Sequence, residues 1–163
     1  MFLSISDFSQ VVQNTPLVSI DLCILKGREL LLGERVNPPA KNFFFVPGGR
    51  ILKSELIKNA FNRILKNELG LSLKNNHNDC IKNLGCYEHF YNDNFLGNSD
   101  FSTHYVVLAY LIPFESLIKN YDERISEQHS EYIWIDIDNL KSSSYKIHSN
   151  SMAYLDNPIF RSL

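Results

Sequence analysis

The feature that most constrains this sequence is a helical stretch at residues 53–69, flanked on both sides by strand-like segments. Its apolar residues recur at helical spacing, about 100° per residue, and form one stripe: Ile57, Ala60, Phe61, Ile64 and Leu65. Gly70 follows the last turn and predicts the end of the helix there. One long helix between strands, with little βαβ regularity, predicts an α/β (α+β) fold. The expected architecture is a three-layer α/β/α sandwich with a mixed β-sheet.

The other elements are predicted from hydrophobic runs and turn residues. Short helices are expected at residues 6–13, 136–140 and 149–155. Strands are expected at residues 16–25, 29–32, 43–46, 84–91, 102–112 and 132–135. The first two strands, joined by Lys26-Gly27-Arg28, predict a hairpin. Pro47-Gly48-Gly49 predicts a tight bend.

Composition and charge exclude several classes of protein. Hydrophobic residues make up 44% of the chain and charged residues 21%, and the net charge is −2. This balance gives no attraction to nucleic acid or anionic membranes, and the longest apolar runs, such as residues 106–112, are too short to cross a bilayer. Cys23, Cys80 and Cys86 form no CxxC pair, which argues against a disulfide framework or a zinc site. We expect a single domain over residues 1–163, located in the cytoplasm.

Glu68 is out of place on the predicted helix. It projects into the apolar stripe four residues after Ile64, in the last turn before Gly70, where the helix dipole disfavours an anion. A carboxylate there is costly unless a cation meets it. Two interpretations stay open at this point: a cation binds Glu68, or the helix ends early and Glu68 turns into water.

The residues around this helix resemble the Nudix box. That pattern is a glycine, five residues, a glutamate, seven residues, and then Arg-Glu-apolar-x-Glu-Glu-x-Gly-apolar. The positions that match in register are Gly49, Glu55, Arg63, Leu65, Glu68, Gly70 and Leu71. The resemblance to the Nudix hydrolases implies a Nudix-type sandwich in which helix carboxylates bind magnesium that bridges a diphosphate. It also implies that Glu55 and Arg63 order the loop before the helix.

Two positions depart from the box. Ile64 and Asn67 stand where acidic residues are normal, so Glu68 is the only acid left in that cluster. A single carboxylate is a small set of side chains for both holding magnesium and activating water. Either the chemistry has been lost, or further ligands and a base come from elsewhere in the chain.

Beyond the box, the sequence is similar to the GDP-mannose mannosyl hydrolases, a Nudix branch that keeps only the last glutamate of the cluster. The matching segments are Thr15-Pro-Leu-Val-Ser-Ile-Asp21, Phe45-Val-Pro-Gly-Gly-Arg50, His89-Phe-Tyr-x-Asp-Asn-Phe95, Thr103-His-Tyr-Val-Val107 and Glu127-Gln-His129. The resemblance implies that water attacks the anomeric carbon of GDP-mannose and releases GDP and free sugar with inversion. GDP-glucose and GDP-fucose are further candidate substrates.

The same resemblance implies a metal site and a base. Mg²⁺, with Mn²⁺ as a substitute, would take the backbone carbonyl of Gly48, the carboxylate of Glu68 and the side-chain carbonyl of Gln128. His129 would be the general base. From the residues alone, His129 is also consistent with a surface histidine in a polar loop.

Substrate-binding roles are implied for five further residues. Arg35, Arg50 and Tyr105 would bind the diphosphate and stabilise it as a leaving group. Asp21 and His89 would lie near the sugar, although a hydrogen-bonded structural role is an open alternative for both, as a core position is for Tyr105. Asp21 interrupts an apolar strand and needs a partner, either an arginine or a sugar hydroxyl.

Three functions are weighed on this basis: a GDP-sugar glycosyl hydrolase, a conventional Nudix pyrophosphatase that attacks phosphorus, and a non-enzymatic nucleotide-sugar sensor. The retained Gln128 and His129 favour the first. The resemblance also suggests a homodimer. Phe8, Val11 and Val12 form an apolar stripe that would dock on the core or on a second subunit.

Overall fold

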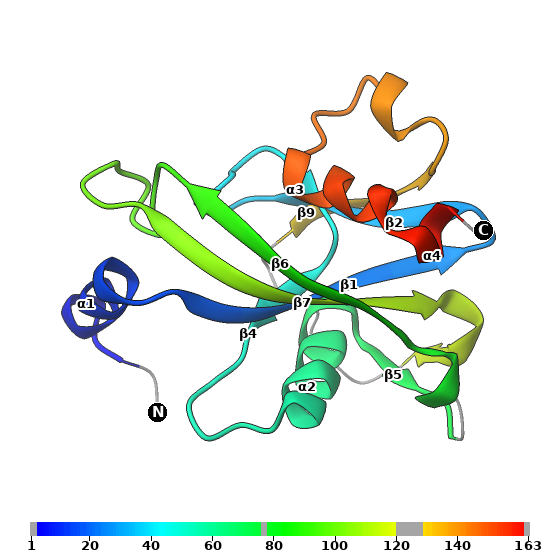
Figure 1. The fold of residues 1–163 in the computed structure, drawn as a ribbon, viewed down its shortest axis with the longest axis horizontal. Helices are drawn as coiled ribbons and strands as arrows, with labels where there is room; N and C mark the ends of the chain where they lie inside the picture. Colours follow the sequence, from blue (N-terminus) through cyan, green and yellow to red (C-terminus); the bar gives the residue numbers. More distant parts are fainter. Residues whose placement is uncertain (1–2, 76–77, 120–128, 162–163) are drawn as a thin grey trace.

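A mixed β-sheet forms the middle layer of the protein (Figure 1). The computed structural model describes residues 3–75, 78–119 and 129–161. In this part of the chain the strand order is β3-β2-β1-β7-β6, and β4 and β9 pair with β1 and β2. The strands are β1 (Leu17–Lys26), β2 (Glu29–Arg35), β3 (Phe44–Phe45), β4 (Gly48–Arg50), β6 (Lys82–Tyr91), β7 (Thr103–Pro113) and β9 (His129–Asp136). The sheet is mixed because β1 and β7 run parallel while the other pairs are antiparallel.

Helices cover both faces of this sheet, so the predicted α/β/α sandwich is confirmed (Figure 1). Residues of β1 alternate between the two faces. Ile20, Leu22 and Ile24 pack toward α2 (Ile57–Leu69). Cys23 and Leu25 pack toward the C-terminal segment. That segment contains η3 (Leu140–Ser142), α3 (Ser149–Ala153), η4 (Tyr154–Asp156) and α4 (Pro158–Arg161).

Helix α2 keeps the predicted C-terminus but starts later than expected. It begins at Ile57 because the preceding residues form a turn, in which Ser54 has a positive φ of 62°. Ile57 is therefore 48% exposed and does not complete the apolar stripe. Gly70 takes the left-handed conformation, φ 62°, that ends the helix. Glu68 is buried, so the interpretation of an early helix end is wrong.

Two local predictions are wrong. The expected bend at residues 47–49 is instead the entry to β4, whose residues 48–50 pair antiparallel with residues 19–21 of β1. The expected helix at residues 136–140 is a turn, in which the Asp136 side chain accepts a hydrogen bond from the amide of Asp138. The hairpin of β1 and β2 and the long strands β6 and β7 are confirmed.

The N-terminal helix α1 (Ile5–Asn14) docks on its own chain. Val12 is buried, and the ring of Phe8 lies 4.6 Å from that of Phe95. The smaller elements are β5 (Leu71–Leu73), which pairs with β8 (Leu117–Lys119), and the single turns η1 (Asn78–Cys80) and η2 (Phe114–Ser116). Among the described helices, none has the length and apolar character needed to span a membrane. The three cysteines are free.

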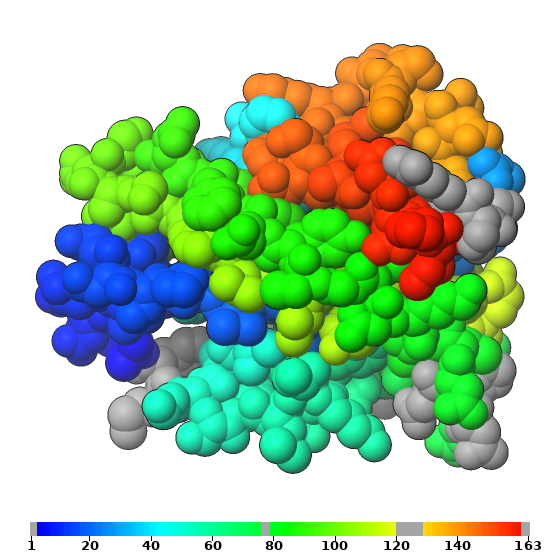
Figure 2. Space-filling view, viewed as in Figure 1, coloured from blue at the N-terminus to red at the C-terminus, as the bar shows by residue number. Residues whose placement is uncertain are grey.

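The C-terminal segment is joined to the sheet by backbone contacts. Phe44 of β3 donates to the carbonyl of Lys146 at 2.9 Å and accepts from the amide of His148 at 3.1 Å. The amide of Val46 donates to Oγ of Ser151 at 3.1 Å. Figure 2 shows this segment, coloured orange to red, lying directly against the green atoms of β6. The C-terminal segment thus packs beside β3 and supports the chain that leads into β4.

Candidate active site

A cavity of about 430 Å³ opens beside β1, β4, β6 and β7, next to helix α1. Six of the residues singled out in the sequence line it together: Asp21, Arg35, Gly48, Arg50, His89 and Tyr105. They come from five strands, so only the folded sheet brings them into one site. Glu68 and His129 do not line this cavity.

One side of the cavity carries an acid that is held by a buried tyrosine. Oδ2 of Asp21 accepts a hydrogen bond of 2.6 Å from the hydroxyl of Tyr154. Burial raises the pKa of Asp21 to about 6, although the Tyr154 hydrogen bond and the charge of Arg35 act to lower it. Nε2 of His89 lies 3.3 Å from the same hydroxyl, and burial lowers the pKa of His89 to about 4. The imidazole of His89 is therefore neutral at neutral pH.

Two guanidinium groups and a phenol line the cavity as well. Arg35 uses Nε to donate to the carbonyl of Pro39 at 3.0 Å, which fixes the plane of its guanidinium. The guanidinium of Arg50 lies 4.1 Å from the ring centre of Phe8, a cation–π contact that joins α1 to the cavity wall. Burial raises the pKa of Tyr105, so its hydroxyl stays protonated and can donate to an anion. This set of donors suits phosphate oxygens.

Glu68 and His129 meet in the protein interior. Oε2 of Glu68 lies 3.8 Å from Nδ1 of His129, and the two side chains are 7% and 2% exposed. Helix α2 supplies Glu68, and the pairing of β9 with β2 places His129 opposite Arg35. Burial and the charge of Arg35 lower the pKa of His129 to about 4. The interpretation of His129 as a solvent-exposed surface histidine is therefore wrong, and the neutral imidazole can accept a proton.

Tyr132 determines which nitrogen of His129 carries the proton. Its hydroxyl donates to the backbone carbonyl of Glu68 at 2.9 Å, and this bond uses the single hydroxyl proton. The contact of 3.0 Å between that hydroxyl oxygen and Nδ1 of His129 must then be donated by the ring. His129 is accordingly the Nδ1–H tautomer, which leaves Nε2 as the proton-accepting nitrogen.

Gly33 provides the space for this imidazole. A Cβ at position 33 would lie 2.5 Å from Cδ2 and 2.7 Å from Cγ of His129, and 2.9 Å from Cε1 of Tyr132. All three atoms belong to partly or fully buried rings, and Cγ is the ring atom nearest the backbone, so a methyl group there would overpack the site and force the rings to shift.

We expect Gly33→Ala to keep the fold and to impair turnover. Displacement of a reacting group by about 1 Å can cost about 10²-fold in rate, so kcat should fall by as much as about 10²-fold, and Tm should fall as well because overpacking typically costs about 1–3 kcal/mol. Steady-state kinetics and thermal unfolding measure the two effects. Gly27→Ala is a control for kcat, because nothing lies within 4 Å of a Cβ there; its φ of 61° strains a side chain, so Tm should fall while kcat stays at the wild-type value. A Gly33→Ala variant with wild-type kcat would show that the imidazole of His129 does not need the space at position 33.

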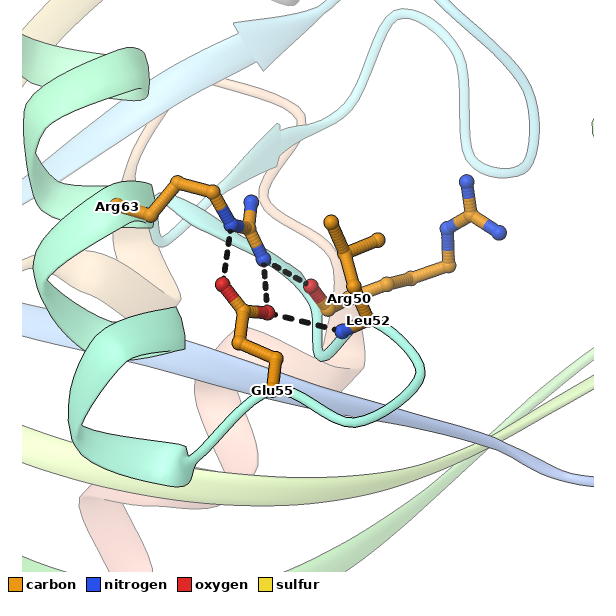
Figure 3. Close-up of polar contacts among 4 residues, drawn as sticks. All are labelled: Arg50, Leu52, Glu55 and Arg63. Carbon is orange, nitrogen blue, oxygen red and sulfur yellow. Dashed lines mark hydrogen bonds and ion pairs between the residues drawn. The ribbon is translucent and has the colours of Figure 1, made fainter. Parts of the chain in front are cut away.

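The loop before α2 is held by a bidentate ion pair (Figure 3). Arg63 donates from Nε and Nη2 to the two carboxylate oxygens of Glu55 at 2.7 and 2.8 Å. Nη2 of Arg63 also donates to the carbonyl of Arg50 at 2.8 Å, and the amide of Leu52 donates to Glu55 at 2.9 Å. The expected loop-ordering role of Arg63 and Glu55 agrees with this geometry, and the carbonyl of Arg50 is held by the same pair.

The ion pair predicts a pH dependence of stability. The hydrogen bonds from Arg63 lower the pKa of Glu55 from 4.5 to about 2. Because the folded-state pKa is depressed, the stabilisation is present above pH 4.5 and is lost as the pH falls toward about 2. We expect the Tm difference between the wild type and Glu55→Gln to shrink over that interval. Thermal unfolding of both proteins at a series of pH values measures it, and a Tm difference that is independent of pH would contradict the prediction.

Some of the residues singled out in the sequence carry oxygen donors of the kind that a hard divalent cation accepts. Among the described residues, no group of three or more His, Cys, Asp or Glu side chains is placed to hold a metal. Glu68 offers a carboxylate and Gly48 a backbone carbonyl, the oxygen donors that Mg²⁺ accepts. Gln128, the third predicted ligand, lies outside the described residues. These donors do not form a complete protein cage, so a bound Mg²⁺ would need further oxygen ligands from substrate or water.

Comparison with known proteins identifies the family. The NUDIX domain pattern matches residues 15–155 of this chain. The chain belongs to the Nudix family. It is 35% identical to the low-salt glycan biosynthesis protein Agl8 of Haloferax volcanii over 125 residues, which are 77% of this chain and 74% of that protein.

Solved Nudix structures have the same fold. A MutT Nudix hydrolase from Burkholderia pseudomallei superposes with a TM-score of 0.68 at 20% identity and covers 89% of this chain and 99% of that one. The Nudix domain of Shewanella oneidensis NrtR, complexed with ADP ribose, superposes with a TM-score of 0.63 at 14% identity and covers 99% of this chain and 100% of that one. Membership of the Nudix family indicates a hydrolase of a nucleotide or pyrophosphate substrate.

The two departures from the Nudix box have different structural roles. Ile64 is 1% exposed and packs in the core under the sheet, and a Cβ on Gly49 would lie 3.2 Å from its side chain. Asn67 is exposed. Position 64 is thus part of the apolar core, and Glu68 is the acid of this cluster that the Nudix helix retains.

Sequence reasoning missed Tyr154 and Tyr132, which contact Asp21, His89, Glu68 and His129. The only available signal was a tyrosine on the apolar face of a predicted helix or strand, which is equally typical of the core. His104, by contrast, lies on the face of β7 opposite to Tyr105, since successive strand residues alternate. It stacks on Phe90, away from the cavity.

Proposed function

We propose that this Nudix protein hydrolyses a GDP-sugar, with GDP-mannose as the first candidate and GDP-glucose and GDP-fucose as further ones. Water attacks the anomeric carbon, and the products are GDP and free sugar of inverted configuration. The observation that carries this proposal is the replacement of acids by Ile64 and Asn67 together with the burial of His129 beside Glu68. The helix has few carboxylates with which to activate water at phosphorus, whereas a neutral imidazole is available as base.

In this mechanism His129 takes the proton from water on Nε2. The water oxygen forms a bond to the anomeric carbon, and the bond from that carbon to the diphosphate oxygen breaks. Its electron pair leaves on GDP, where Arg35, Arg50 and Tyr105 stabilise the added charge with hydrogen bonds. No acid is needed to protonate this leaving group, which agrees with an active site of few carboxylates. An inverting glycosidase uses the same geometry of attack.

Mg²⁺, or Mn²⁺ in its place, would be held by Glu68, the carbonyl of Gly48 and Gln128. Its role when bound would be to neutralise the charge of the diphosphate.

Two further observations support a nucleotide-sugar substrate. Phe8 and Phe95 line the cavity next to Arg50 and offer flat aromatic surfaces for a nucleobase. The name of the related Haloferax protein places that protein in glycan biosynthesis, a process that consumes activated sugars.

Hydrolysis in ¹⁸O-water tests the site of attack. GDP-mannose is incubated with the protein and Mg²⁺, and the products are separated and analysed by mass spectrometry. Attack at carbon places the label in free mannose and yields unlabelled GDP. Label in GMP or in sugar 1-phosphate would overturn the proposal. A panel of nucleotide sugars in the same assay identifies the preferred substrate.

Cleavage between the phosphorus atoms is the second candidate function. It is favoured by the intact Nudix loop, in which the Glu55–Arg63 pair holds the carbonyl of Arg50. The labelling experiment separates the two reactions. A protein that binds GDP-mannose but turns over no nucleotide sugar at saturating Mg²⁺ would instead be a sensor.

We also propose that two copies associate as a homodimer. The support is the exposure of Ile5, 68%, and Leu3, 53%, at the N-terminal helix, whose Phe8 and Val12 are used within the chain. Light scattering coupled to size-exclusion chromatography gives the mass in solution, and a monomeric mass would overturn this proposal.

A further inference from the structure

Tyr154 stands out among the described residues as a polar side chain in an apolar core. It is 0% exposed and packs with Cys23, Leu25 and Phe160 between the sheet and the C-terminal helices. A buried phenol needs a hydrogen-bond partner for its hydroxyl. The hydroxyl of Tyr154 has two, Asp21 and His89, and both of these residues line the cavity. Tyr154 is therefore connected to the site although it does not line the cavity.

The directions of these hydrogen bonds follow from the chemistry of the three groups. The carboxylate of Asp21 can only accept, so the single proton of the Tyr154 hydroxyl is donated to Oδ2 across 2.6 Å. The hydroxyl oxygen is then free to accept, and Nε2 of His89, 3.3 Å away, is the donor. His89 carries its proton on Nε2 and presents Nδ1 as an acceptor. This is the opposite tautomer to that of His129.

We propose that Tyr154 is a positioning residue for the sugar-binding end of the cavity. Its hydroxyl donates to Oδ2 of Asp21 and leaves Oδ1 to accept from a ligand. The same hydroxyl accepts from Nε2 of His89, so Nδ1 of His89 carries no proton and is an acceptor. Both residues line the cavity, and acceptors there would bind hydroxyl groups as donors and repel phosphate oxygens. The inference rests on the proposed function and adds Tyr154 to it, as the residue that leaves Oδ1 of Asp21 and Nδ1 of His89 to accept hydrogen bonds from the sugar.

Gly48 supports the availability of Oδ1. A Cβ at position 48 would lie 2.5 Å from Oδ1 of Asp21, so the absence of a side chain there leaves space beside that oxygen. The backbone pairing of Asp21 with Gly48 in β1 and β4 holds the two residues at this distance. Oδ1 is thus kept open on one side while Oδ2 is bound on the other.

Tyr154→Phe tests the inference by removing only the hydroxyl. We expect kcat for GDP-mannose with Mg²⁺ to fall by about 10–100-fold, the range found when a partner that orients a binding group is lost. KM should change less, because most contacts to the nucleotide remain. Tyr87→Phe is the matched control, since its ring meets that of Tyr154 edge-on, 4.7 Å between centres, and its hydroxyl bonds only outside the site. Its kcat should equal that of the wild type.

The ¹⁵N spectrum of the histidine side chains provides a measurement that does not depend on activity. In the wild type we expect His89 as the Nε2–H tautomer and His129 as the Nδ1–H tautomer. In Tyr154→Phe the pattern of His89 should change while that of His129 stays. A wild-type His89 protonated on Nδ1 would overturn the inference even if the variant does not fold. A folded Tyr154→Phe with unchanged kcat or an unchanged His89 spectrum would also overturn it.

Failure of the proposed function has a different signature. Label from ¹⁸O-water in a phosphate product would refute attack at carbon, and it would leave the two histidine tautomers as described. If the ¹⁸O label is found in the sugar but His89 has the other tautomer, only the role of Tyr154 is refuted.

Discussion

Replacing His129 with glutamine should lower kcat for GDP-mannose by about 10²–10⁴-fold, the range for losing a general base. Glutamine keeps a polar side chain of similar length, but it cannot take a proton from water. The nucleotide contacts of Arg35, Arg50 and Tyr105 would be unchanged, so the affinity for the substrate should change little. Steady-state kinetics with Mg²⁺ measures kcat, and binding of GDP by calorimetry measures the affinity.

His104→Gln is the matched control for this replacement. His104 lies on the face of β7 opposite to Tyr105, stacked on Phe90 with 4.3 Å between ring centres, and has no contact with Glu68 or Tyr132 among the described residues. Its replacement should leave kcat at the wild-type value. If His129→Gln also turns over at that value, His129 is not the base, and the pairing of Tyr132 with its Nδ1 has only a structural purpose.

Glu68→Gln is expected to have the second largest effect, on the dependence of turnover on metal. Glu68 is the only acid that the Nudix helix retains in its metal-binding cluster, and glutamine lacks the charge that attracts a divalent cation. The Mg²⁺ concentration for half-maximal turnover should rise by more than about 100-fold, above the range for loss of an outer-shell partner. Titration of turnover with MgCl₂ measures the effect.

Glu29→Gln is the control for the loss of a carboxylate. Glu29 is 44% exposed on the surface, where it pairs with Lys26. Its replacement should not alter the Mg²⁺ titration. An unchanged Mg²⁺ dependence in Glu68→Gln would mean that position 68 does not hold the metal, and the reason given above for its burial would fail.

The part of the site that residue spacing alone predicts is local in the chain, whereas cavity residues from separate strands, such as Asp21 and His89, were expected only from the family resemblance. Gly49, Glu55, Arg63, Glu68 and Gly70 belong to one continuous stretch, and their spacing determines where each lies on a loop or a helix. The ion pair of Arg63 with Glu55 joins residues eight positions apart. The burial of Glu68 follows from the same spacing, since helical periodicity alone places it on the apolar face.

The part that could not be predicted depends on pairing between distant strands and segments. The hydrogen bond from Tyr154 to Asp21 joins residues 133 positions apart, and that from Tyr132 to Glu68 spans 64 positions. No periodicity within a helix or strand encodes such contacts. The strand β4 was missed for the same reason, because its hydrogen bonds are made with β1 and its own sequence is Gly-Gly-Arg.

The start of α2 shows how a local rule can fail. Lys53 and Glu55 are compatible with a helix, yet residues before 57 form a turn that is closed by the bonds of Glu55 to Arg63 and Leu52. The carboxylate makes more hydrogen bonds in the turn than it would on a solvated helix. Tertiary contacts therefore outweigh helix propensity at the N-terminal end of α2. At its C-terminal end, Gly70 alone is sufficient to end the helix.

The contact between Val46 and Ser151 has a consequence for the newly made protein. A ribosome synthesises the chain from its N-terminus at about 5–20 residues per second. Ser151, the partner of Val46, is therefore translated 105 residues later. At that rate the delay is about 5–20 seconds. The loop of β3 and β4 therefore emerges before the segment that supports it. A nascent copy can complete this contact only after Ser151 has been translated.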